Sequence, residues 1–93
     1  MKYWLVNVTK MNPTFLKSYI EKAIIDGSYL KIDYVDSKMK VTKDRIIQPM
    51  ELKKNKDTGN FDRLVAQDMG KADLRSFVFE GIQKCKVVDL KDL

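Results

Sequence analysis

Hydrophobic and polar positions alternate in two different periods along the chain. The apolar and aromatic run Tyr3–Val8 contains β-branched residues, which predicts a strand. Asn12 and Pro13 then form a typical helix start, with asparagine as N-cap and proline in the first turn. Helical spacing continues to Gly27, so a helix is predicted over 12–27 with this apolar stripe: Phe15, Leu16, Tyr19, Ile20, Ala23 and Ile24.

From residue 28 onward the apolar period changes to two. Leu30, Ile32 and Tyr34 alternate with less apolar neighbours, which predicts a half-buried strand. Pro49 has no N–H to donate, so it marks a sheet edge or a bend in the next strand. Further strands are predicted, separated by polar turns, at 39–52, 64–67, 74–79 and 86–90.

One helix followed by short, closely spaced strands predicts an α+β fold. We expect the N-terminal strand and the helix to pack on a small antiparallel barrel of four to five strands. The 93 residues suffice for a single domain, 1–93, with the extra strand in 1–11, the helix in 12–27 and the barrel in 28–90.

The composition argues against most enzyme classes. The chain has no histidine and one cysteine, Cys85, which removes histidine-based triads, Cys–His dyads and histidine- or cysteine-rich zinc sites. Its four glycines are too scattered to form a phosphate-binding loop, and its carboxylates follow turns without a shared metal-binding spacing. We therefore expect a protein that is not an enzyme, with no metal and no cofactor.

The sequence also indicates where the protein works. No stretch approaches the roughly 20 apolar residues of a membrane-spanning helix, and no cationic leader followed by an apolar run opens the chain. A lone thiol suits a reducing compartment. The expected location is the cytoplasm, with no membrane contact.

The net charge of +5 is concentrated in one segment. Residues 38–56 contain seven basic and two acidic side chains, while the flanking parts are nearly neutral. A concentrated positive field attracts phosphates in a salt-dependent way. The alternative is a solvated, lysine-rich strand pair that keeps a sheet edge soluble.

Arg75 is the first candidate for ligand contact. It is in phase with Phe77 and Phe79, on a face that we expect to be buried. A buried guanidinium needs a partner, either a ligand phosphate or a carboxylate. The carboxylate candidates are Asp33, Asp68 and Asp73.

Other candidates have two interpretations each. Arg45 lies beside Lys43 and Asp44, which suggests an exposed side chain that serves either solubility or ligand contact. Tyr34 either stacks on a base or packs in the core, as its alternation suggests. Arg63 adds a cation near the expected pocket.

Four segments together carry a family resemblance. The strand 30–34 reads L-x-I-x-Y, residues 45–52 read R-x-x-x-P-x-x-L, and Leu64–Ala66 and Leu74–Ile82 follow in the same order as in the family. The run from Phe15 to Leu90 therefore resembles a WYL domain, a small Sm-like (SH3-type) barrel of bacterial and phage regulators. We expect a divergent, standalone version of that domain.

The resemblance implies a function, although the sequence differs from the family pattern at three positions. WYL domains are thought to bind nucleotides or single-stranded nucleic acid through basic and aromatic residues. By that likeness Arg45 and Arg75 are the positions that would contact an anionic ligand. Together with the candidates from the residues themselves, the predicted ligand-binding set is Arg75, Arg45, Tyr34, Arg63, Phe77 and Lys43. The family's tryptophan and tyrosine are replaced by Asp62 and Arg63, and its second arginine in the last motif is replaced by Gly81.

Two functions follow as expectations. The first is a non-enzymatic regulatory module that binds a nucleotide or single-stranded nucleic acid through a basic and aromatic pocket. The alternative is a protein-interaction module or a small inhibitor, of the kind phages encode, acting on a partner protein in trans through an edge strand or barrel contacts. In that case Tyr3–Val8 could also pair two copies into a homodimer.

Overall fold

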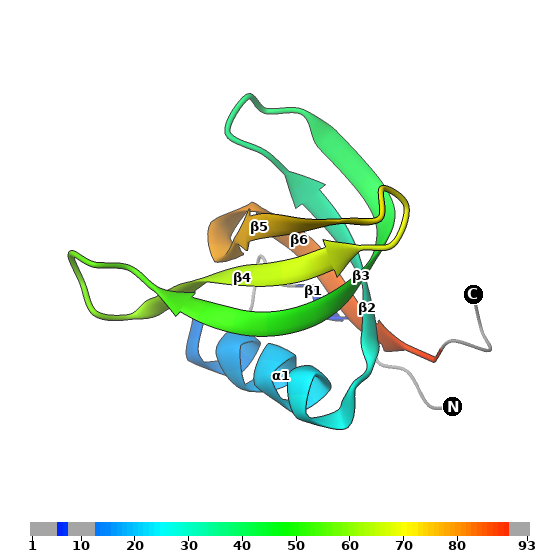
Figure 1. Ribbon diagram of the computed structural model, residues 1–93. Helices are drawn as coiled ribbons and strands as arrows, with labels where there is room; N and C mark the ends of the chain where they lie inside the picture. The colour runs from blue at the N-terminus through cyan, green and yellow to red at the C-terminus, as the bar shows by residue number, and fades with distance from the viewer. Residues whose placement is uncertain (1–5, 8–12, 90–93) are drawn as a thin grey trace.

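The computed structural model describes residues 6–7 and 13–89, which form one helix and a six-stranded antiparallel sheet (Figure 1). The strand order is β1-β6-β2-β3-β4-β5. The predicted α+β fold is therefore confirmed. Its elements are β1 (Val6–Asn7), α1 (Pro13–Asp26), β2 (Tyr29–Val35), β3 (Val41–Lys54), β4 (Phe61–Asp68), β5 (Asp73–Val78), the 3-10 turn η2 (Phe79–Gly81) and β6 (Ile82–Val88).

The helix α1 ends as its sequence predicts. Gly27 adopts a left-handed backbone with φ of 68°. The N–H of Ser28 donates to the carbonyl of Ala23 at 2.9 Å, and the N–H of Gly27 donates to that of Ile24 at 3.2 Å. These two bonds satisfy carbonyls that the last helical turn leaves open, and glycine accepts the required conformation without strain.

The core lies between α1 and the concave face of the sheet. Leu16, Ile20 and Ala23 of α1 are buried, whereas Phe15, at the margin of the predicted stripe, is exposed. In β2 the residues alternate between buried and half-buried, as the period of two predicts. The buried cluster also contains Leu30, Ile32, Tyr34, Ile47, Leu64, Ala66, Phe77, Phe79, Ile82 and Cys85.

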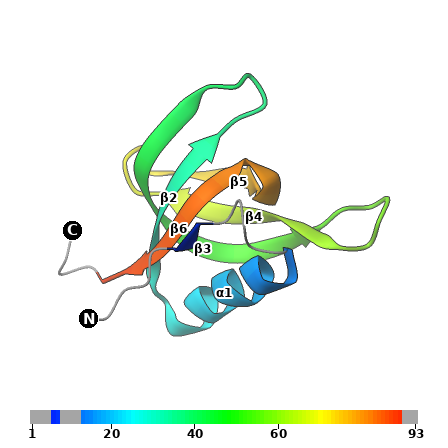
Figure 2. The same ribbon diagram turned by 180° about the vertical axis from the view of Figure 1, so that it is seen from behind.

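The sheet curls until β5 approaches β2. The Tyr34 hydroxyl accepts the N–H of Val78 at 2.9 Å, and the rings of Tyr34 and Phe77 meet edge to face at 5.0 Å. Strands β6, β2, β3, β4 and β5 thus form a meander that folds back on itself, with η2 before the last strand (Figure 2). The sheet is antiparallel throughout, as the sequence predicts.

Gly81 lies where the sheet folds back most tightly. A Cβ at this position would lie 2.5 Å from the Val35 carbonyl oxygen and 2.7 Å from Cε1 of Tyr34. Only a residue without a side chain fits there. An arginine here, as in the pattern that the sequence resembles, would clash with Val35 and Tyr34 in this structure.

The long strand β3 is bent where the sequence predicts. Its pairing with β2 ends at Ile47, and the register against β4 shifts between Pro49 and Glu51. The missing N–H of Pro49 therefore falls beyond the β2 ladder and beside a bulge. The bend lets β3 serve both halves of the curled sheet.

The terminal strands β6 and β1 differ from their predicted bounds. Strand β6 begins at Ile82 rather than at residue 86, because η2 turns the chain immediately after β5. Of the predicted strand Tyr3–Val8, the structure describes Val6 and Asn7, which pair with Cys85 and Lys84 of β6; the rest of it, with Asn12, lies outside the described residues. Within residues 6–7 and 13–89, no helix is long and apolar enough to cross a membrane.

Candidate ligand-binding site

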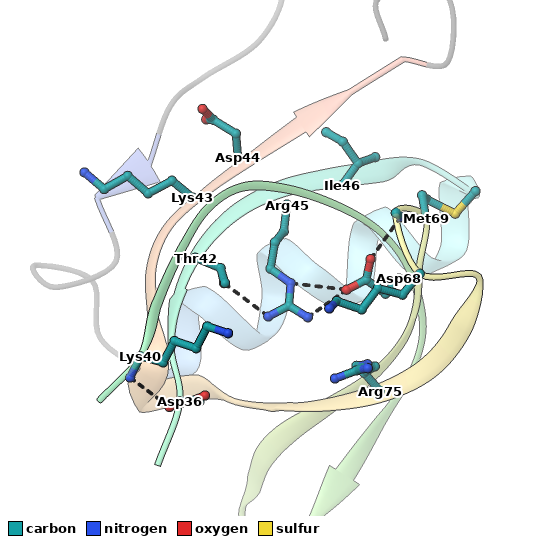
Figure 3. Close-up of a pocket in the computed structure, with 12 residues that line it drawn as sticks. Asp36, Lys40, Thr42, Lys43, Asp44, Arg45, Ile46, Asp68, Met69 and Arg75 are labelled. Atoms are coloured by element: carbon teal, nitrogen blue, oxygen red, sulfur yellow. Dashed lines mark hydrogen bonds and ion pairs between the residues drawn. The ribbon is translucent and has the colours of Figure 1, made fainter. Parts of the chain in front are cut away.

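A cavity of about 790 Å³ opens where the β2–β3 hairpin meets the β4–β5 turn (Figure 3). Five of its lining side chains are cationic and three are acidic. We call it the cationic cavity, and its lining residues are Asp36, Lys40, Thr42, Lys43, Asp44, Arg45, Ile46, Asp68, Met69, Gly70, Lys71 and Arg75.

A buried ion pair forms the floor of the cationic cavity. Nη2 and Nε of Arg45 donate to one carboxylate oxygen of Asp68 at 2.7 and 3.2 Å, and Nη1 donates to the Thr42 hydroxyl at 3.1 Å. The Arg45 and Asp68 side chains are only 15% and 5% exposed. The guanidinium also lies over the ring of Phe77, 5.0 Å from its centroid. Arg45 is therefore fixed in place before any ligand arrives.

Asp68 is held as a carboxylate. Burial alone would raise its pKa, but the hydrogen bond and charge of Arg45, together with the N–H groups of Gly70 and Lys71, lower the pKa below its usual value. The N–H of Gly70 donates to Asp68 at 3.0 Å, so the carboxylate also shapes the β4–β5 turn. One residue thus joins the floor of the cavity to its rim.

A bulge in β3 forms one wall of the cavity. Ile32 pairs with Arg45 and Tyr34 with Thr42, so two residues of β3 lie opposite Asp33 alone. Asp44, within this bulge, has a φ of 55°, and its N–H donates to the Asp33 carboxylate at 2.9 Å. An aspartate tolerates this left-handed conformation better than most residues.

The hairpin turn places a lysine on the rim. The Asp36 carboxylate accepts the N–H groups of Lys38 and Lys40 at 2.8 and 2.9 Å. The hydrogen bond from Lys40, aided by the second bond and the two lysine charges, lowers the pKa of Asp36. Lys40 extends its ammonium toward the centre of the cavity, while Lys43 points away from it (Figure 3).

The predicted burial of Arg45 and Arg75 is wrong for both residues. Arg75 is 42% exposed rather than buried, and Nε donates to Asp73 at 3.2 Å. The cause is the edge position of β5, where Phe77 is the only buried residue. Arg45, expected to be exposed, is the buried one, because the bulge turns it inward onto Asp68. Asp73 was one of the three carboxylates predicted for Arg75.

The structure brings together three of the six predicted ligand-binding residues: Arg45, Arg75 and Lys43 all line the cationic cavity. Tyr34 and Phe77 are buried in the core, and Phe77 supports Arg45 from below. Arg63 lines a different cavity at the β3–β4 hairpin. A role for these last three residues in ligand binding stays a prediction.

Sequence reasoning missed three contributors to this site. Lys40 and Lys71 reach the rim from turns, and Asp68 was considered only as a partner for Arg75. The available signal was their place at the predicted turns: Lys40 follows Asp36–Ser37, and Asp68 and Lys71 lie within Asp68–Asp73. Which turns lie side by side depends on how the sheet curls, and the sequence alone does not predict that curl.

The lining of the cationic cavity has the charges and hydrogen-bond donors to hold an anion. None of the described residues that line it is aromatic, so recognition there would rest on charge and hydrogen bonding instead of stacking. Among residues 6–7 and 13–89, no group of three His, Cys, Asp or Glu side chains is arranged to hold a metal. The side chain of Cys85 lies in the core, where burial raises its pKa to about 12.

Fold and site together define a small α+β domain with a curled antiparallel sheet and a cationic cavity, and the comparison with solved structures agrees with this fold. The chain matches part of the structure of proteasome accessory factor B/C (PafBC) of Arthrobacter aurescens, with a TM-score of 0.61 and 21% identity. The match covers 84% of this chain and 12% of that one. It supports a WYL-like fold. No family model and no curated protein matches the sequence.

Proposed function

We propose that this chain is a non-enzymatic regulatory module that binds a nucleotide or single-stranded nucleic acid by its phosphates in the cationic cavity. The observation that carries the proposal is the imbalance of charge there. Arg45 is neutralised by Asp68, but Lys40, Lys71 and Arg75 remain exposed at the rim with less acidic compensation. Exposed cations around a concave surface concentrate phosphates from solution.

Arg75 is the residue expected to contact the ligand most directly. Within the described residues, Arg75 donates to Asp73 through Nε and not through its two terminal nitrogens. Both side chains are about half exposed. The two terminal nitrogens therefore stay available for a bidentate contact with a phosphate. Arg45 has a supporting part, because its pairing with Asp68 sets the shape of the floor.

The regulatory part of the proposal is supported by the likeness of folds. The matched structure is a WYL-domain-containing regulator, and the sequence resembles the same domain family. A domain that binds a ligand without chemistry can act by reporting that ligand to an attached or separate partner. We propose that it works in the cytoplasm, in keeping with a single buried thiol.

The test is binding of a fluorescently labelled oligothymidylate, and of AMP, to the purified chain. We expect affinity to fall steeply between about 50 and about 200 mM salt. Binding to phosphates releases counterions from the nucleic acid, and a higher salt concentration makes that release less favourable. Arg75→Ala should weaken binding about 10- to 150-fold, since a charge-assisted hydrogen bond contributes roughly 1.5–3 kcal/mol.

The matched control is Lys22→Ala, which removes one positive charge from the exposed face of α1, away from the cationic cavity. This variant should bind like the wild type. Equal losses in both variants would show attraction by net charge alone, and binding unaffected by Arg75→Ala would refute the proposed site.

A protein-interaction module is the second candidate, and the edge strand β5 favours it. One side of β5 pairs with β4, and the other has no strand beside it in the described residues. Leu74 and Val78 are exposed on this strand. Such an edge can accept a strand from a partner or from a second copy. Light scattering after size exclusion tests this candidate. A complex formed by the wild type should be lost in Leu74→Lys, which places a charge on the exposed edge. A wild type that stays monomeric and forms no complex with a partner argues against the candidate.

A further inference from the structure

A second cavity, of about 620 Å³, lies at the β3–β4 hairpin and is more basic than the first in proportion to its size. Four cationic side chains and one acidic side chain line it. We call it the hairpin cavity, and its residues are Lys53, Lys54, Asn55, Lys56, Asp57, Arg63, Val65 and Ser76.

Two of these cations lie directly opposite each other. Lys53 and Arg63 are paired in the β3–β4 register. Like charges in this arrangement destabilise a sheet. Their nearest carboxylates, Glu51 and Asp62, lie at 4.0 and 3.7 Å, beyond hydrogen-bond distance, and both cations are about half exposed. The arrangement weakens the fold and gains an attraction for anions.

The hairpin that carries these cations is ordered by its own hydrogen bonds. The Asn55 side chain accepts the N–H of Asp57 at 2.8 Å and donates to the Asp62 carboxylate at 2.9 Å. The Gly59 N–H closes the turn onto the Asn55 carbonyl at 2.8 Å. The loop that joins the two cation-bearing strands is therefore ordered before binding, which lowers the entropy lost on binding.

The two cavities flank the edge strand β5. Arg75 lines the cationic cavity and its neighbour Ser76 lines the hairpin cavity, so the two open on opposite sides of β5. Because β5 is an edge strand, a ligand chain can pass over it from one cavity to the other. Arg75 pairs with Ala66 of β4, three residues from Arg63, so the two arginines are separated along the sheet by roughly 10 Å at about 3.3 Å per residue.

We propose that the hairpin cavity is a second phosphate-contacting site, and that the ligand is a single strand of nucleic acid that spans both cavities. A single phosphate cannot bridge a separation of this size between residues on opposite faces of the sheet, so a strand of several nucleotides is required. A mononucleotide cannot contact both sites. This inference rests on the proposed function and narrows its ligand to a polyanion.

The test compares AMP with a series of oligothymidylates of increasing length. Affinity should rise with length until both cavities are reached. The variant Lys53→Ala/Arg63→Ala should leave AMP binding unchanged and weaken binding of the longer strands. Losing two phosphate contacts lowers the salt slope by about 1.4, so wild-type affinity should fall about sevenfold more than the variant's between about 50 and about 200 mM salt.

The matched control is Lys22→Ala/Lys84→Ala, which removes the same charge from surfaces that line neither cavity. If control and hairpin variants bind long strands equally, this inference is wrong. An Arg75→Ala effect without a hairpin effect overturns it and leaves the proposed function standing. A hairpin effect without an Arg75→Ala effect contradicts the proposed function, and with it the continuous path.

Urea unfolding verifies that the variants are folded. Removing one of two opposed cations relieves repulsion, so Lys53→Ala should be at least as stable as the wild type. A marked loss of stability would mean that these cations hold the fold, which would overturn their assignment to ligand binding.

Discussion

Asp68→Asn tests whether the floor of the cationic cavity depends on the buried ion pair. The substitution keeps an oxygen for the Gly70 N–H but removes the charge that Arg45 faces at 2.7 Å. Breaking a fully buried pair costs about 3–5 kcal/mol. Arg45 is 15% exposed and keeps its bond to Thr42, so we expect about 2–3 kcal/mol.

The loss should appear as a urea midpoint lower by about 1–2 M, at the slopes usual for a small domain. Asp73→Asn, at the exposed pair with Arg75, is the control and should cost about 0–1 kcal/mol. Equal stabilities for Asp68→Asn and Asp73→Asn would refute the assignment of Arg45 as the buried arginine.

The pH dependence gives a second readout of the same pair. Folding lowers the pKa of Asp68, so its contribution is complete above the unfolded-state value of about 3.9 and is lost as pH falls through the folded value. The stability difference between wild type and Asp68→Asn should therefore be constant near neutral pH and shrink in acid. A difference that grows below about pH 4 would show that Arg45 does not stabilise the carboxylate.

Three further predictions concern the core. Gly81→Ala should destabilise the fold by about 1–3 kcal/mol, seen as a lower Tm, because its Cβ would meet Val35 and Tyr34; an unchanged Tm would mean that the backbone there yields freely. Tyr34→Phe leaves the N–H of Val78 without its acceptor and should cost about 1 kcal/mol in urea unfolding, and no loss would indicate that water replaces the hydroxyl. Cys85 should resist thiol reagents at pH 8 until the protein unfolds, since burial raises its pKa to about 12; rapid labelling of the folded protein would contradict its burial.

The elements of the fold were largely predictable because each has a local signal. The period of two in β2, the glycine that ends α1 and the proline in β3 act through their own backbone. Pro49, for example, restricts pairing wherever the strand lies. The onset of β6 at Ile82 was missed because η2 depends on the tight return of the sheet over Gly81.

The candidate site was only partly predictable, because burial of a charged residue depends on neighbours far away in sequence. Arg75 shares the period of Phe77, yet β5 lies at the edge of the sheet and leaves it exposed. Arg45 looks exposed beside Lys43, yet a bulge turns it onto Asp68, 23 residues later. Neither outcome has a local signal.

The two aromatic residues predicted for the pocket, Tyr34 and Phe77, lie in the core for a similar reason. Tyr34 and Phe77 pack edge to face in the core and line no part of the cationic cavity. A family pattern identifies such residues without distinguishing a stacking surface from the support beneath a cation. In this chain Phe77 lies under Arg45 and Tyr34 joins β2 to β5.

The most direct measurement is an amide NMR titration of the labelled protein with a short oligothymidylate at low salt. We expect progressive shifts confined to the walls of the cationic cavity, above all at Lys40, Lys71 and Arg75, and their loss in Arg75→Ala. An absence of shifts at these residues under saturating ligand, or shifts spread evenly over every exposed lysine, would contradict a built phosphate site.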